Sequence, residues 1–75
     1  MSEKKYEIVK ITTEYITLGQ LLKLVNVIGN GSEAKKYVFS HEIKVNNEIS
    51  TQRGRKLYPS FLIEIDNSLF FEIKW

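Results

Sequence analysis

The residues of this chain that are best suited to chemistry are clustered cations, which bind anions. Arg53-Gly54-Arg55-Lys56 places three positive charges within four residues, and they repel one another unless water or an anion screens them. Arginine is suited to bidentate contacts with phosphate or with the Hoogsteen edge of an exposed guanine. Lys35 and Lys36 form a second basic pair. Two separate clusters favour polyanion binding over charge that only solubilises the surface.

Positive charge is concentrated in the middle of the sequence. Residues 35–56 include six basic and two acidic side chains, a net charge of +4, whereas the whole chain carries +2 at pH 7. The remainder therefore sums to −2. A basic centre within a slightly acidic chain predicts one positive face, for which polyanions are the obvious partner.

Catalytic chemistry finds little support in the composition. The chain has no cysteine and one histidine, His41, and its neighbour Ser40 does not by adjacency acquire the geometry of a nucleophile with its base. The acids are scattered, and histidine pairs at metal-ligand spacing are absent. We expect no enzyme activity, no catalytic residue, no metal site, no cofactor and no small-molecule substrate. His41 is expected at a helix end or on the surface.

Length and composition limit the chain to one small domain. The 75 residues are 43% hydrophobic and 27% charged, which suits a single globular domain over residues 1–75. Residues 1–5 lead into alternating residues and not into the apolar segment of an export signal. No apolar run approaches the roughly 18 residues that cross a bilayer. We expect a cytoplasmic protein without a membrane partner.

Two short helices are predicted before residue 41. The first has capping-box spacing at Thr17 and Gln20, and Gly29 is expected to end it in the left-handed conformation. In the second, Asn30 and Glu33 have the spacing of a cap and its partner. Each helix has one apolar stripe, formed by Leu18, Leu21, Leu22 and Val25 in the first and by Ala34, Tyr37 and Val38 in the second.

The rest of the chain alternates in the manner of strands. Residues 6–12 predict a first strand, and residues 43–45 and 48–50 predict a hairpin whose turn is Asn46-Asn47. Residues 51–56 contain no apolar side chain and predict a solvated loop. Residues 61–65 and 69–75 predict two further strands around a turn at residues 66–68, and the last strand could pair with the first. The expected fold is α+β, with two packed helices against a small, mostly antiparallel sheet.

Aromatic side chains fall into two groups. Tyr15 precedes the first helix and Tyr58 follows the basic loop, so both could flank the positive surface and stack on bases, although core or rim positions are the more usual use of such residues. The others are assigned to the core or to an apolar flank: Phe61, Phe70, Phe71 and Trp75. Phe71 and Trp75 are expected on one face of the last strand, together with Ile73.

These features together resemble the RNA-binding domain of the ribosomal protein S-four type, also called the αL motif. The resemblance covers about residues 13–65 and is strongest to the small stand-alone bacterial YaaA-type subfamily. It rests on the first helix with Leu18, Leu22, Val25 and Val27, on Asn30 at the cap, on Ala34-Lys35 and Tyr37-Val38, on Ile43-Lys44-Val45-Asn46-Asn47, and on the segments 14–20 and 53–59.

The resemblance implies non-catalytic binding of structured RNA, such as ribosomal or transfer RNA, with the ribosome as a further partner. Some basic positions of the motif are missing, because Thr17 and Gly31 stand where arginine is common. Asn47 and Ser60 stand where glycine is usual. We expect phosphate contacts from Lys35, Lys36, Arg53, Arg55 and Lys56, with Lys23 and Lys44 at the rim.

This hypothesis requires the basic loop to lie alongside the start of the second helix, so that both contact one sugar-phosphate backbone. Two alternatives remain open at this point. One is a DNA-binding module that uses the same charges. The other is a protein-docking adaptor that uses an apolar C-terminal patch of Phe70, Phe71 and Trp75.

Overall fold

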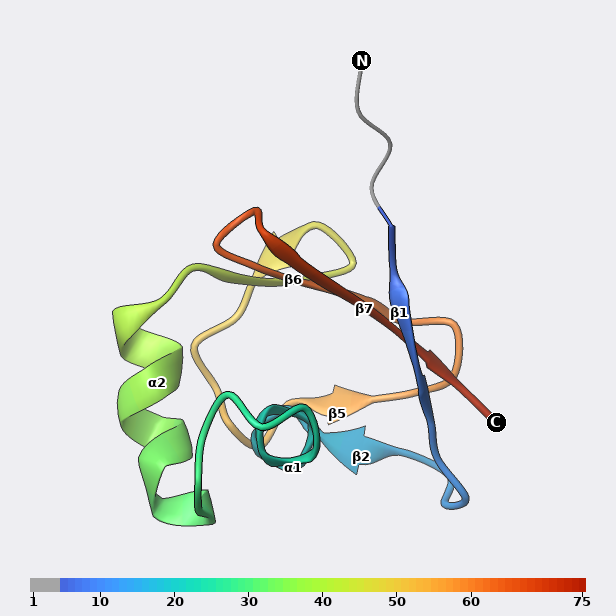
Figure 1. Ribbon diagram of the computed structural model, residues 1–75, viewed down its shortest axis with the longest axis horizontal. Helices are drawn as coiled ribbons and strands as arrows, with labels where there is room; N and C mark the ends of the chain where they lie inside the picture. Colours follow the sequence, from blue (N-terminus) through green and yellow to red (C-terminus); the bar gives the residue numbers. More distant parts are fainter. Residues whose placement is uncertain (1–4) are drawn as a thin grey trace.

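The computed structural model describes residues 5–75 (Figure 1). The prediction that the chain has no export signal was made on residues 1–5, and residues 1–4 lie outside this described part. The elements in chain order are β1 (Glu7–Lys10), β2 (Ile16–Thr17), α1 (Leu18–Leu24), the 3₁₀ turn η1 (Gly31–Glu33), α2 (Ala34–Ser40), β3 (Ile43–Val45), β4 (Glu48–Ile49), β5 (Lys56–Leu57), β6 (Leu62–Ile65) and β7 (Leu69–Lys74).

The larger sheet has the strand order β1-β7-β6-β3-β4. Its β1–β7 pair is parallel and its other pairs are antiparallel, so the prediction that the first and last strands pair is confirmed. The register places Ile43 opposite Ile65 and Ile63 opposite Phe71, and all four side chains are buried. The domain thus has two helices and a mostly antiparallel sheet, as the α+β prediction requires.

The start of α1 agrees with the sequence, but its end does not. The Thr17 side chain accepts a hydrogen bond from the Gln20 amide, and the Gln20 side chain accepts one from the Thr17 amide, which completes the predicted capping box. The helix ends at Leu24, and Asn26, with φ of 64°, is the left-handed residue. The prediction that Gly29 has this role is wrong, because no glycine has positive φ.

The physical reason is a Schellman motif that forms one turn earlier. The Asn26 amide donates to the Lys23 carbonyl and the Val27 amide donates to the Leu22 carbonyl, each at 3.1 Å. These two bonds satisfy carbonyl groups that the helix end leaves without partners. Val27, which the family resemblance places inside the helix, therefore follows it and packs against the core.

The second helix starts through a tighter turn than predicted. Asn30 caps η1, since its side chain accepts from the Ser32 amide at 3.0 Å. The Glu33 carboxylate accepts from the Gly29 amide at 2.6 Å and not from Asn30, one residue earlier than a capping box would place it. The α2 helix follows directly, with Ala34 and Val38 buried and Tyr37 half-buried, as its apolar stripe predicts.

The β3–β4 hairpin confirms the predicted turn. Asn46 and Asn47 both have positive φ, 52° and 71°, which is the combination that a type I′ turn needs. The Asn46 amide donates to the Leu62 carbonyl at 2.8 Å, and its side-chain oxygen accepts from the Leu62 amide at 2.9 Å. One asparagine therefore joins this turn to the start of β6.

A single hydrophobic core includes buried side chains from α1, α2 and both sheets. Leu18, Leu21 and Leu22 of α1 are completely buried. Two predictions at the C-terminus are corrected: Trp75 lies beyond β7 and is 63% exposed, whereas Phe71 is buried and cannot belong to an exposed patch. Within the described residues, no helix is long and apolar enough to span a membrane.

Candidate nucleic-acid interface

The basic loop, residues 51–55, is attached to the start of α1 through its backbone. The Leu18 amide donates to the Arg55 carbonyl at 2.9 Å, and the Gly19 amide donates to the Arg53 carbonyl at 2.8 Å. A further bond from the Arg55 amide to the Gln52 carbonyl closes a turn inside the loop. The first amides of α1 have no partner within their own helix, so the loop satisfies them.

Gly19 is the point where the loop and both helices meet. A Cβ placed on Gly19 would lie 3.4 Å from the Cβ of Ala34 and 3.4 Å from the Arg53 carbonyl oxygen. The loop therefore lies beside the start of α2 as well as that of α1, which the RNA-binding hypothesis requires. An open hollow of ≈ 350 Å³ marks this junction, and its lining includes Lys23, Gly31 and Arg53.

The loop leads into a short antiparallel ribbon that the sequence did not predict. Here β2 pairs with β5, with Ile16 opposite Leu57 and Thr17 opposite Lys56. Lys56, which was expected at the end of the loop, is thus the first residue of a strand. Its ammonium lies 5.0 Å from the centre of the Tyr15 ring, and the Tyr15 and Tyr58 ring centres are 5.5 Å apart.

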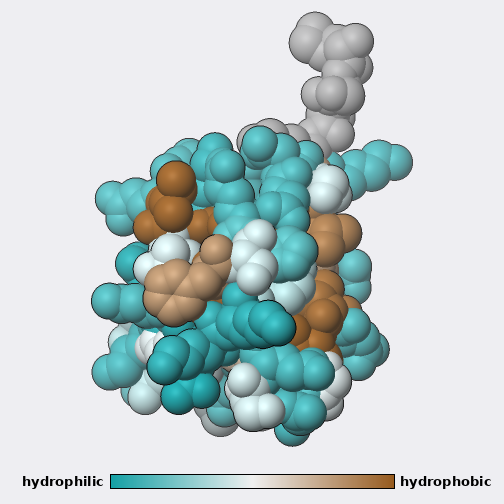
Figure 2. Space-filling view, turned by 90° about the vertical axis from the view of Figure 1, so that its left-hand side faces the viewer, coloured by the Kyte–Doolittle hydropathy of each residue, from teal (hydrophilic) through white to brown (hydrophobic). Residues whose placement is uncertain are grey.

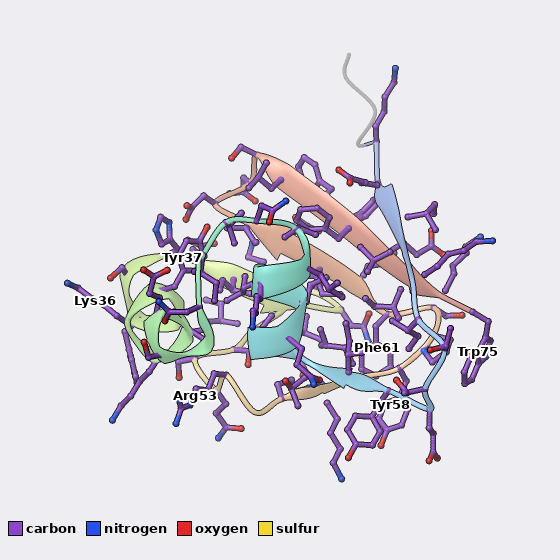
Figure 3. The ribbon with its side chains drawn as sticks, turned by 60° about the horizontal axis from the view of Figure 1, so that its bottom comes forward. Lys36, Tyr37, Arg53, Tyr58, Phe61 and Trp75 are labelled. Atoms are coloured by element: carbon purple, nitrogen blue, oxygen red, sulfur yellow. The ribbon has the colours of Figure 1, made fainter. Side chains whose placement is uncertain are left out.

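The predicted contact residues do not all lie together. Lys23, Arg53, Arg55 and Lys56 surround the junction or continue from it, and Lys35 is the exposed second residue of α2, next to Ala34. Lys36 instead lines a separate hollow with Ser40 and His41. In Figure 3, Lys36 extends from α2 at the left, while Arg53 and Tyr58 extend from the lower side.

Lys44 lies further from this group. It alternates with the buried Ile43 and Val45 on β3, so its side chain is on the opposite face of the sheet from the core. Its ammonium is 3.5 Å from a Glu42 carboxylate oxygen. The position of Lys44 therefore gives less support to its predicted role at the rim.

His41 joins two elements, and its surroundings are those of a structural residue. It caps the end of α2, its ring stacks on Tyr37, and its Nδ1 is 2.6 Å from an Asp66 carboxylate oxygen. The other Asp66 oxygen accepts from the Glu42 amide at 2.8 Å. Hydrogen bonds from His41 and from this amide lower the pKa of Asp66 below 3.8. Burial, and secondarily the charge of Asp66, raises the pKa of Tyr37.

In the part of the chain that the structure describes, no group of three or more histidine, cysteine or acidic side chains is placed to hold a metal ion.

Exposed apolar side chains are distributed over different elements. The largest exposed fractions belong to Leu24 of α1, Phe39 of α2, Ile49 of β4 and Trp75. Phe70 is half-buried, and its ring meets Tyr6 edge to face. Figure 2 shows the side of the molecule that carries α2, where small apolar areas are separated by hydrophilic residues. The C-terminal patch proposed for protein docking loses Phe71, which is buried.

Two comparisons with known proteins agree with this architecture. A model of the S4 domain family matches residues 9–73. A protein of Bacillus subtilis (strain 168), named "Probable ribosome maturation protein RlbA", is 46% identical over 65 residues, which covers 87% of this chain and 92% of that protein. The match therefore includes the basic loop, both helices and most of the larger sheet.

Proposed function

Since the chain belongs to the S4 domain family, we propose that it is a non-catalytic module that binds structured RNA through the basic loop and the starts of its two helices. The motif that binds RNA spans about residues 13–65 of a single domain. The name of the Bacillus subtilis relative favours ribosomal RNA over transfer RNA as the target. The partner would then be the ribosome or its precursors, in the cytoplasm.

The observation that carries the proposal is the junction at Gly19. There the backbone of the basic loop bonds the first turn of α1, and Gly19 in that turn also faces Ala34 at the start of α2, so the start of α2 lies close to the loop. Among the described residues, no carboxylate forms an ion pair with Arg53, Arg55 or Lys56. Cations without carboxylate partners remain available for phosphate.

Charge contacts with phosphate predict a steep dependence on salt. Each neutralised phosphate releases condensed counterions, so neutralising ~4 phosphates gives a slope of log affinity against log salt of roughly −3 to −4. Such contacts set affinity and register but carry little sequence information. Recognition of the fold of the RNA therefore depends on how the cations are spaced.

The test is the double variant Arg53→Ala/Arg55→Ala, measured with a ribosomal RNA fragment over a series of salt concentrations. We expect weaker binding and a slope shallower by roughly 1–2, because two phosphate contacts are lost. The matched control is Lys5→Ala/Lys74→Ala, which removes the same charge from exposed lysines outside the proposed surface. Equal affinity and slope in the wild type and the arginine variant would reject the proposal. Competition with duplex DNA separates RNA binding from general polyanion binding.

A further inference from the structure

The β2–β5 ribbon presents an aromatic pair on its outer face. Ile16 and Leu57 are opposite each other and buried, so the residues that flank them in each strand point outward. Extending the register by one residue places Tyr15 opposite Tyr58, in agreement with the 5.5 Å between their ring centres. Both rings are only half-buried. The ribbon therefore keeps its aliphatic side in the core and its tyrosines at the surface.

The two tyrosines are held in place before any ligand arrives. The Phe61 ring meets the Tyr58 ring edge to face at 5.7 Å, and the Phe61 amide donates to the Tyr58 carbonyl at 3.0 Å. The Thr13 hydroxyl donates to the Tyr15 carbonyl at 2.8 Å. Because the rings are already ordered, less conformational entropy is lost when something stacks on them.

Positive charge adjoins this pair. The Lys56 ammonium is 5.0 Å from the centre of the Tyr15 ring, and Arg55 precedes Lys56 directly. Arg55 is three positions before Tyr58, which corresponds to roughly 10 Å of extended chain. An open hollow of ≈ 680 Å³ lies beside Tyr15, lined by that residue, Thr17 and Gln20 among others. Figure 3 shows Tyr58 and Arg53 extending from the same side of the molecule.

We propose that Tyr15 and Tyr58, with Lys56, form a stacking platform for one unpaired RNA base, next to the phosphates that Arg53 and Arg55 contact. This inference rests on the proposed function and adds to it that the target has an unpaired nucleotide beside its folded part. The aromatic faces take the base, which any sequence can offer, and the ammonium takes the adjoining phosphate. A protein ligand is less suited to the platform, because the aromatic pair is small and the Lys56 ammonium lies against it.

The test uses three RNA probes: a hairpin with a single-stranded adenosine tail, the same hairpin with an abasic tail of equal length, and the hairpin alone. The abasic tail keeps every phosphate of the adenosine tail and lacks only the bases of the tail, so the comparison separates base stacking from charge. We expect the wild-type protein to bind the adenosine tail about tenfold more tightly than the abasic tail. The variant Tyr15→Leu/Tyr58→Leu loses this preference, whereas its affinity for the hairpin alone and its salt slope are unchanged.

Two controls make the result specific. Tyr15→Phe keeps the ring and retains the preference, and Phe39→Leu removes an exposed aromatic ring of α2 and also retains it. If the leucine variants do not fold, ring-proton NMR of the wild type answers the question. Stacking shifts the Tyr15 and Tyr58 ring signals with the adenosine tail and not with the abasic tail.

The outcomes separate this inference from the proposed function. Equal affinity of the wild type for the two tails, with the steep salt dependence intact, overturns the platform and leaves RNA binding in place. No measurable binding to any probe at low salt counts against both proposals.

Discussion

Replacing Gly19 tests whether close backbone contact is what holds the basic loop. A Cβ on this residue would lie 3.4 Å from the Ala34 Cβ and from the Arg53 carbonyl oxygen, which is ordinary contact. Gly19→Ala therefore fits without displacement. Alanine favours the helix by up to ~1 kcal/mol over glycine, so we expect the free energy of unfolding to rise by up to that amount. Urea unfolding measures it.

Gly19→Leu is expected to have the opposite effect. Its further carbon atoms need space that the Ala34 Cβ and the Arg53 backbone already occupy, and neither neighbour is the end of a flexible side chain. Overpacking of this kind costs typically ~1–3 kcal/mol. Displacing the loop relieves it, so the amides of Leu18 and of residue 19, which bond the loop, should exchange faster with solvent and RNA binding should weaken.

The matched control for this experiment is Gly54→Leu in the same loop. A Cβ on Gly54 meets nothing within 4 Å, so its stability should stay within about 0.5 kcal/mol of the wild type. If Gly19→Leu unfolds at the wild-type urea concentration and its amides at residues 18 and 19 remain as protected, the junction does not hold the loop and the reasoning above is refuted.

Three further predictions concern turns and one ion pair. Ser60→Gly should stabilise the domain by ~1 kcal/mol, because Ser60 has φ of 81° in a turn that suits glycine; thermal unfolding should shift upward by about 4–8 °C. Asn46→Gly keeps the turn but loses the hydrogen bond to the Leu62 amide, so urea unfolding should show a loss of ~1 kcal/mol. The pKa of Asp66 is lowered in the folded state. Asp66 therefore stabilises the folded state above its unfolded pKa near 3.8, and this stabilisation is lost as the pH falls through the lower folded pKa. In Asp66→Asn, the free energy of unfolding should depend less on pH in this acidic range, and removal of His41 should have the same effect.

Local chemistry explains which parts of the fold could be predicted from the sequence. The capping box at Thr17 and the turn at Asn46-Asn47 depend on residues within a few positions of one another, and both formed as predicted. The strands predicted from alternation over residues 61–65 and 69–75 correspond to β6 (Leu62–Ile65) and β7 (Leu69–Lys74). The basic loop was predicted as solvated because it has no apolar side chain, and residues 51–54 are exposed.

Competition between similar signals explains the errors at element ends. Asn26 and Gly29 can both adopt positive φ, and the Schellman bonds of Asn26 and Val27 decide between them. Trp75 continues the alternation of β7. The last residue pair between β7 and β1 is Lys74 with Lys10, so Trp75 has no partner in β1, and its side chain is largely exposed. The local sequence pattern predicts neither which residue ends a helix nor how long the neighbouring strand is.

The ribbon was missed for a different reason. A strand of two residues is too short to show a period, and the pairing of Ile16 with Leu57 joins distant parts of the chain. One signal in the sequence could have indicated the ribbon: Tyr15 and Tyr58 are each next to an apolar residue, Ile16 and Leu57, that could be buried in the core. Sequence reasoning thus predicted a set of candidate cations but not the role of Gly19, the residue at which the basic loop and both helices meet.

The backbone of the loop determines which of its groups can bind an anion. The N-terminal amides of a helix attract anions, and positive side chains beside them are normally unfavourable. In this fold the Arg55 carbonyl accepts from the Leu18 amide and the Arg53 carbonyl accepts from the Gly19 amide, so those amides cannot hold a phosphate. The carbonyls also place partial negative charge at the positive end of α1, which offsets the nearby cations. Anion binding at the start of α1 must therefore come from side chains, and for that reason the salt slope of the arginine variant is the decisive measurement.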